Sequence, residues 1–161
     1  MTVFEWEINR TASGQFRQFE SAEPFVLESS EPVHVGQFLV SLSWNGDPSF
    51  LMFPAVEEWR GTYIFTTGRG FTVNYVSLAL PVGADVSLDG DIDVHSSACT
   101  DAVPIGNIDG TEYEQIICPI ADGVHIVDSG EELVGVTVYG YYGAGSYAYS
   151  AGSDLHQIFL I

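Results

Sequence analysis

The fold of this chain is decided by one stretch, Gly123-Val-His-Ile-Val-Asp-Ser-Gly-Glu-Glu-Leu-Val-Gly-Val-Thr-Val-Tyr-Gly-Tyr-Tyr-Gly-Ala-Gly-Ser-Tyr-Ala-Tyr-Ser-Ala-Gly152. Val134, Val136 and Val138 alternate with small or polar residues, which is the period-2 pattern of a strand with one face toward a core. Residues 124–127 alternate in the same way, and Asp128-Ser-Gly-Glu131 between the two runs is rich in turn formers. The stretch therefore predicts two strands joined as a hairpin.

The rest of the chain continues this pattern of short strands. Its 161 residues suffice for one well-buried domain, so we expect a single domain over residues 1–161. Gly, Pro and polar residues interrupt the apolar runs at short intervals, and no amphipathic helix stands out; residues 55–59 form the one expected helical turn. The predicted fold is an all-β, two-sheet antiparallel sandwich of Greek-key or jelly-roll type. The expected strands are 3–8, 16–20, 25–28, 33–43, 49–54, 62–66, 71–80, 84–88, 92–95, 102–105, 112–117, 124–127, the run from residue 134, 146–149 and 155–161.

One order of residue types occurs twice. Val26–Phe38 and Ile126–Tyr139 both run through an apolar pair, an acid, a Ser, a small turn residue, a Glu, a β-branched run and an aromatic residue. Each copy is followed by a Ser-aromatic pair, Ser49-Phe50 in the first and Ser146-Tyr147 in the second. We interpret this as a weak internal duplication, although two unrelated β-hairpins with acidic turns would share part of the pattern.

The charge of the chain limits its partners. Four Arg and no Lys stand against 22 Asp and Glu, which gives a net charge of −18. A surface this acidic repels phosphate backbones and anionic lipids, so we expect no nucleic-acid partner. No run reaches the roughly 18 apolar residues needed for a membrane span, so we expect no membrane insertion. The apolar run 155–161 at the C-terminal end favours a domain cut from a larger protein.

A family resemblance rests on the opening stretch. The pattern Gly-x-His-x-x-x-Ser from Gly123, then Gly135-Val-Thr-Val-Tyr-Gly-Tyr141 and Ser146-Tyr-x-Tyr-x-Ala-Gly152, resembles the N-terminal domain family of IgG Fc-binding protein. Upstream segments are similar to the same family in the same order. They are Val35-Gly-Gln-Phe-Leu39, Gly46-Asp-Pro-Ser-Phe50, Tyr63-Ile-Phe-Thr-Thr-Gly68, Phe71-Thr-Val-Asn-Tyr-Val76 and Val86-Ser-Leu-Asp-Gly90. The resemblance covers most of residues 25–152. It implies an extracellular or cell-surface β-rich module of binding or adhesive type, and it brings no catalytic residues.

The two cysteines fit that extracellular setting. Cys99 and Cys118 are the only cysteines of the chain. In an extracellular module such a pair is expected to form a disulfide, and the alternative is two free thiols. Neither cysteine belongs to a C-x-x-C pair, which argues against a zinc site.

One acidic cluster resembles half of a calcium site. Asp89, Asp91 and Asp93 alternate along one loop, so their carboxylates can converge on one side, and calcium takes six to eight such oxygen ligands. The full calcium-loop pattern is absent. In a chain with 22 acidic residues, three at alternate positions also arise by chance. Calcium is the one ion that the sequence suggests, and no other cofactor is expected.

Aromatic residues supply the candidate binding positions. Tyr142 is expected at an exposed turn, and Trp44 lies in the predicted turn Trp44-Asn-Gly-Asp-Pro48. Tyrosine and tryptophan are common binding hot spots, so both are candidate contact residues. The neighbouring tyrosines are expected to pack in the core or between the sheets. They are Tyr139, Tyr141, Tyr147 and Tyr149. Inward rings are likewise expected for His34 and His125.

These observations favour a binding protein over an enzyme. The chain has no G-x-S-x-G and no H-E-x-x-H motif. We expect a non-catalytic extracellular binding or adhesion module whose ligand is a protein or a glycan. One alternative is a structural subunit of a surface fibre or shell, in which copies of the chain assemble by strand complementation. The other is a carbohydrate-active hydrolase that uses paired carboxylates.

Overall fold

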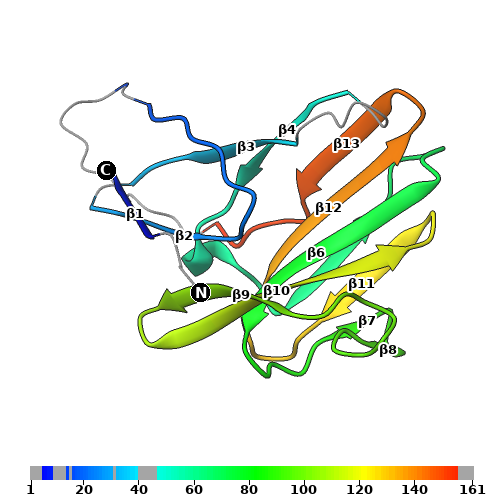
Figure 1. Ribbon diagram of the computed structural model, residues 1–161. Coiled ribbons are helices and arrows are strands. Elements are labelled where there is room, and N and C mark those ends of the chain that lie inside the picture. Colours follow the sequence, from blue (N-terminus) through cyan, green and yellow to red (C-terminus); the bar gives the residue numbers. More distant parts are fainter. Residues whose placement is uncertain (1–4, 9–13, 15, 31, 40–46, 156–161) are drawn as a thin grey trace.

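The computed structural model describes residues 5–8, 14, 16–30, 32–39 and 47–155 (Figure 1). Within these ranges the chain forms strands and one 3-10 turn, η1 (Val56–Glu58), and none of its helices could span a membrane. The turn lies where the sequence predicts it. The strands are β1 (Glu5–Ile8), β2 (Val26–Ser29), β3 (Val35–Leu39), β4 (Ser49–Phe53), β5 (Thr62–Thr66), β6 (Val73–Pro81), β7 (Ser87–Leu88), β8 (Ile92–Asp93), β9 (Val103–Ile108), β10 (Thr111–Ile120), β11 (Val124–Asp128), β12 (Gly135–Tyr142) and β13 (Gly145–Ser150).

Two antiparallel sheets form the body of the molecule (Figure 1). The larger sheet has five strands in the order β13-β12-β6-β10-β9, and the smaller has four in the order β5-β11-β7-β8. Along the sequence the chain passes repeatedly from one sheet to the other, which is the connectivity expected of a Greek-key or jelly-roll sandwich. The prediction of an all-β sandwich is confirmed.

The core lies between these two sheets because alternate residues of their strands point inward. In β6, Val76, Leu78 and Leu80 are fully buried, and the intervening residues are only partly buried. Val136 and Val138 of β12 are buried beside them, as the alternation in the sequence predicts. From the smaller sheet the buried partners are Tyr63, Phe65, Leu88 and Val127. Burial of such apolar side chains is the main stabilising contribution to a domain of this size.

The predicted hairpin between β11 and β12 is wrong. These strands lie in different sheets, since β11 pairs with β5 and β7 whereas β12 pairs with β6 and β13. The buried Ser129 ties the connection to the start of β5: its N–H and its Oγ both donate to the carbonyl oxygen of Gly61, at 2.8 and 2.9 Å. Gly61 permits this approach because a Cβ there would lie 2.2 Å from the carbonyl oxygen of Gly130. The turn formers of this segment therefore make a crossover between sheets.

The N-terminal strands lie beside the sandwich. β1 pairs with β2 in parallel, and β3 pairs with β4 as an antiparallel hairpin (Figure 1). β4 packs along β13, and β2 contacts β9, so both edges of the five-stranded sheet are flanked. The strand expected at residues 16–20 is not formed, and residues 155–161 lie almost wholly outside the described part of the chain.

The internal duplication has a partial structural counterpart. In each copy the first strand, β2 or β11, stays unpaired with the second, and the second and third strands form a hairpin, β3–β4 or β12–β13. The Oγ atoms of Ser49 and Ser146, which are equivalent in the two copies, lie 2.7 Å apart in a hydrogen bond. The first strands differ, because β2 has a parallel partner and β11 has antiparallel ones. The order of elements and the hairpin recur, but the pairing of the first strand does not.

Candidate binding surface

The β3–β4 hairpin carries an exposed apolar platform made of Phe38, Phe50 and Met52. Phe38 and Phe50 are direct cross-strand partners, are 65% and 53% exposed, and have ring centroids 4.9 Å apart. Met52 is exposed two residues further along β4 and pairs with Gly36. The opposite side of β4 is anchored by the buried Leu51. Leu51 therefore holds one face of the hairpin, while the other face exposes aromatic and thioether groups of the kind that is enriched at protein interfaces.

Gly36 sets the position of the platform. A Cβ at this residue would lie 2.5 Å from Cζ of Phe50 and 3.2 Å from Sδ of Met52, so the Phe50 ring lies across the bare backbone of the glycine. Side chains at direct cross-strand positions are neighbours on one face of a sheet, which explains why this ring reaches Gly36. A larger residue at position 36 would displace the ring without removing it.

Of the predicted contact residues Tyr142 and Trp44, the structure describes Tyr142 alone. Tyr142 is 60% exposed at the turn between β12 and β13. Trp44 lies outside the described residues. Asp47 and Ser49, which follow it in the sequence, both contact Ser146 of β13: its Oγ donates to the Asp47 carbonyl oxygen and also bonds with Ser49. The start of β4 is thus fastened to β13 near the turn that carries Tyr142. That Tyr142 and Trp44 contact a ligand stays a prediction.

The other tyrosines of β12 and β13 divide between the two faces of the large sheet. Tyr147 and Tyr149 pack against the core, as predicted. Tyr139 and Tyr141 lie on the outer face, so the expectation that they belong to the core is wrong. Tyr139 stacks on Tyr75 with ring centroids 5.3 Å apart, and burial, followed by the neighbouring Tyr141 and Tyr75, raises the pKa of Tyr139 to about 12. Successive side chains of a strand point to opposite faces of the sheet. Because Val138 points inward, Tyr139 and Tyr141 both point outward.

The hydroxyl of Tyr149 helps to join the two sheets. It donates to the carbonyl oxygen of Thr66 in β5 and accepts from the Thr66 N–H at 3.3 Å. Tyr63 of β5 makes a similar link in the other direction, since its hydroxyl donates to the carbonyl oxygen of Val134 at 2.7 Å. Tyrosines at this seam therefore hold the sandwich together and are not available to a ligand.

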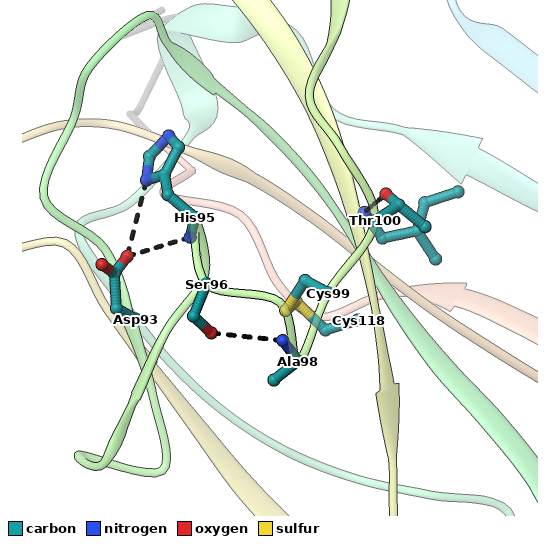
Figure 2. Close-up of a disulfide and its surroundings, with 8 residues drawn as sticks. Asp93, His95, Ser96, Ala98, Cys99, Thr100 and Cys118 are labelled. Atoms are coloured by element: carbon teal, nitrogen blue, oxygen red, sulfur yellow. Dashed lines mark hydrogen bonds and ion pairs between the residues drawn. A yellow bond between two sulfur atoms is a disulfide. The ribbon is translucent and has the colours of Figure 1, made fainter.

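Cys99 and Cys118 form the predicted disulfide (Figure 2). Cys118 is fully buried in β10, and Cys99 lies in the loop between β8 and β9. Two hydrogen bonds run beside the disulfide: the Thr100 N–H donates to the Ile117 carbonyl oxygen at 2.9 Å, and the Ile117 N–H donates to Thr100 Oγ1 at 3.0 Å. The loop is thereby fastened to the large sheet.

The acidic cluster does not form a set of converging ligands. Both oxygens of Asp89 are used within the sheet, because Oδ1 accepts the Ile126 N–H at 2.9 Å and Oδ2 accepts a hydrogen bond from His125 Nδ1 at 2.7 Å. Asp93 Oδ1 accepts the His95 N–H at 2.9 Å (Figure 2). Among the described residues, no group of three or more His, Cys, Asp or Glu is placed to hold a metal ion. The structure gives the calcium expectation for Asp89, Asp91 and Asp93 no further support.

The histidines have structural roles where the structure describes them. His125 is buried and lies against Phe65 with ring centroids 5.8 Å apart, as expected, and its Nε2 also contacts the Ala121 carbonyl oxygen at 2.9 Å. His34 is exposed just before β3, so the expectation of an inward ring is wrong there. His95 Nε2 bonds to Oε1 of the buried Glu114 at 2.9 Å, a pair that sequence reasoning did not find because its members lie on a loop and a strand far apart in the sequence.

Comparisons with known proteins agree with the resemblance seen in the sequence. Residues 5–140 match the family model described as IgGFc binding protein. The match begins earlier than the resemblance and ends before the segment Ser146-Tyr-x-Tyr149, which therefore lies outside it. Searches among curated proteins and among solved structures find no match. Because the matched region covers most of its length, the chain belongs to the IgGFc binding protein family, which implies a non-catalytic binding module.

Proposed function

We propose that the chain is an extracellular module that binds a protein ligand through the Phe38, Phe50 and Met52 platform and carries out no chemistry. The observation that carries this proposal is the exposure of two paired phenylalanines and a methionine on one face of a hairpin whose other face is anchored. Exposed apolar clusters on soluble domains commonly mark interaction sites. The disulfide and the family membership support a secretory setting.

The ligand to test first is the Fc part of immunoglobulin G, because the description of the family names it. A platform of two rings and a thioether suits a protein surface with an apolar contact at its centre, since aromatic hot spots act by filling desolvated pockets. Glycan binding is the alternative for the same surface. Assembly of copies by strand complementation has less support, because β2 and β4 flank the edge strands of the large sheet.

The experiment is a titration of immunoglobulin G Fc fragment and of a glycan panel against the wild-type chain and three variants. Phe50→Ser should weaken Fc binding about 30-fold, the effect of losing a hot spot worth about 2 kcal/mol. Gly36→Val should weaken it comparably by displacing the Phe50 ring. Val103→Ser is the matched control, since Val103 is exposed on β9 at the opposite edge of the sheet, and it should bind within about twofold of wild type.

Three results would contradict the proposal. Fc binding that is absent in wild type, or that is unchanged in both platform variants, would remove the assigned surface. Turnover of a glycan that a single carboxylate-to-amide substitution abolishes, while the fold is retained, would identify a hydrolase instead. Circular dichroism of each variant establishes that the fold is kept.

A further inference from the structure

A second apolar face lies on the outside of the smaller sheet, on β5 and β11. β5 and β11 pair in register, with Ile64 opposite Ile126 and Thr66 opposite Val124. Ile64 and Val124 are 69% and 70% exposed, and Ile126 is exposed as well. We call these three residues the β5–β11 face. Direct and diagonal cross-strand neighbours lie within side-chain reach of one another, so the three form one continuous apolar cluster.

Because the β5–β11 face is on the outside of its sheet, its residues would ordinarily be polar, and their apolar character needs an explanation. The same two strands alternate strictly, and their inward residues are buried, namely Tyr63, Phe65, His125 and Val127. The outward positions of a one-side-buried antiparallel sheet are usually polar. In a chain with 22 acidic residues, three outward β-branched aliphatic residues at neighbouring positions therefore depart from the usual pattern, and packing of the core does not require them.

Acidic side chains held in fixed positions flank β11, the strand that carries two of the three residues of the β5–β11 face. Asp128 ends β11, and its Oδ1 accepts the Gly130 N–H at 3.0 Å. Asp122 precedes β11, and its Oδ1 accepts the Thr67 hydroxyl at 2.7 Å. Asp89 lies beside Ile126, whose N–H it accepts. Within the described part of the chain, neither Asp122 nor Asp128 forms an ion pair with an Arg, so their charges are not neutralised.

The acidic residues beside the β5–β11 face favour a different protein, and not a second copy of the chain, as its partner. Two copies packed through the β5–β11 face would bring the same acidic frame together from both sides, and each copy carries a charge of −18. A partner with an apolar centre and a rim of Lys or Arg would instead place opposite charges around buried apolar contacts, which favours encounter and fixes orientation.

We propose that the β5–β11 face is a docking surface for a protein partner that has aliphatic residues at the centre of its contact surface and basic residues around them. The face is on the four-stranded sheet, whereas the Phe38, Phe50 and Met52 platform is on the separate two-stranded β3–β4 sheet, so this proposal does not depend on the Fc proposal. Both surfaces together would make the module bivalent, able to link two different proteins.

The probe is a cyclic β-hairpin peptide with Val and Ile on one face and Arg along its rim, compared with the same peptide carrying Glu in place of Arg. Nuclear magnetic resonance titration should show shifts at residues 62–66 and 124–128 with the Arg-rimmed peptide, and none with the Glu-rimmed one. The double variant Ile64→Thr/Val124→Thr keeps β-branched residues in both strands, so it should fold normally and bind at least tenfold more weakly. Val82→Thr, at an exposed valine outside the β5–β11 face, should bind as wild type.

Charge is tested separately. Asp122→Asn keeps the oxygen that accepts the Thr67 hydroxyl but removes the charge, so it should weaken the Arg-rimmed peptide severalfold and reduce the dependence of binding on salt. The proposal is overturned if the Arg-rimmed peptide fails to bind at about 1 mM. It is also overturned if both peptides bind equally, or if the double variant binds as wild type. Self-association of the wild-type chain in sedimentation experiments that Ile64→Thr/Val124→Thr abolishes would assign the face to copies of the chain and equally overturn it.

Discussion

Reduction of the Cys99–Cys118 disulfide should lower the stability of the domain by about 3 kcal/mol. The two cysteines are separated by 19 positions. In the chain-entropy model, closing a loop of that size lowers the entropy of the unfolded chain enough to stabilise the folded state by about 3 kcal/mol. Since 1 kcal/mol shifts the melting temperature of a domain of this size by about 2–4 °C, the reduced chain should melt about 6–12 °C lower. It should remain folded at room temperature, because the disulfide encloses the β9–β10 hairpin, whose ladder does not depend on sulfur.

The assay is urea and thermal unfolding of the oxidised chain, the reduced chain and the variant Cys99→Ala/Cys118→Ala. The double variant should lose about 1 kcal/mol more than the reduced chain, because Cys118 is fully buried and alanine leaves its sulfur volume empty. Alkylation of the denatured chain verifies the redox state of each sample. Equal midpoints for the oxidised and fully reduced chains would refute the reasoning that the crosslink stabilises the domain.

Three further predictions test the core, the His95–Glu114 hydrogen bond and a perturbed tyrosine. Val136→Asp should unfold the domain by burying a carboxylate, at a cost of at least about 4 kcal/mol, whereas Thr137→Asp on the outward face should be tolerated; circular dichroism distinguishes them. His95→Ala should cost about 2 kcal/mol in urea unfolding because Glu114 is buried and loses a hydrogen bond, and adding Glu114→Gln should recover part of this loss. With the pKa of Tyr139 raised to about 12 from 10.0, its stabilising contribution is complete below pH 10 and is lost as pH rises through 12. The free energy of unfolding should fall by about 1 kcal/mol over this range after allowance for its partial exposure, and Tyr139→Phe should flatten that fall.

Local pattern in the sequence was sufficient to predict the strands of the sandwich. Residues 62–66 form β5 with the predicted bounds, and Val136 and Val138 point inward as their alternation indicates. These features depend only on neighbours along the chain, because a strand with one buried face needs apolar residues at every second position. The family could also be recognised from the sequence, because its motifs are runs of neighbouring residues.

Pairing between strands could not be predicted in the same way. The turn formers after Asp128 suit a hairpin as well as a crossover, and the choice is made by contacts of Ser129 with Gly61, 68 residues away in the sequence. The strand predicted at residues 16–20 has the right composition but is not part of any sheet among the described residues. Local pattern therefore gives strands, and long-range contacts give the sheets.

The candidate surface was only partly predictable for a related reason. Tyr142 was found because a turn residue next to an alternating strand is exposed almost by necessity. Phe38 and Phe50 were missed, since apolar residues in a strand are usually core residues, and nothing in the sequence says which face of a flanking hairpin packs inward. The alternation of Asp89, Asp91 and Asp93 suggests a calcium site, but the sequence could not show that the Asp89 carboxylate accepts hydrogen bonds from Ile126 and His125.

The most direct test of the proposed function is hydrogen–deuterium exchange of the chain with and without immunoglobulin G Fc fragment. Exchange in a bound segment slows because local opening becomes less frequent. Our account predicts that protection on adding Fc concentrates in residues 35–39 and 49–53, which carry the Phe38, Phe50 and Met52 platform, with residues 62–66 and 124–128 unchanged. Unchanged exchange in both hairpin strands at saturating Fc would contradict it.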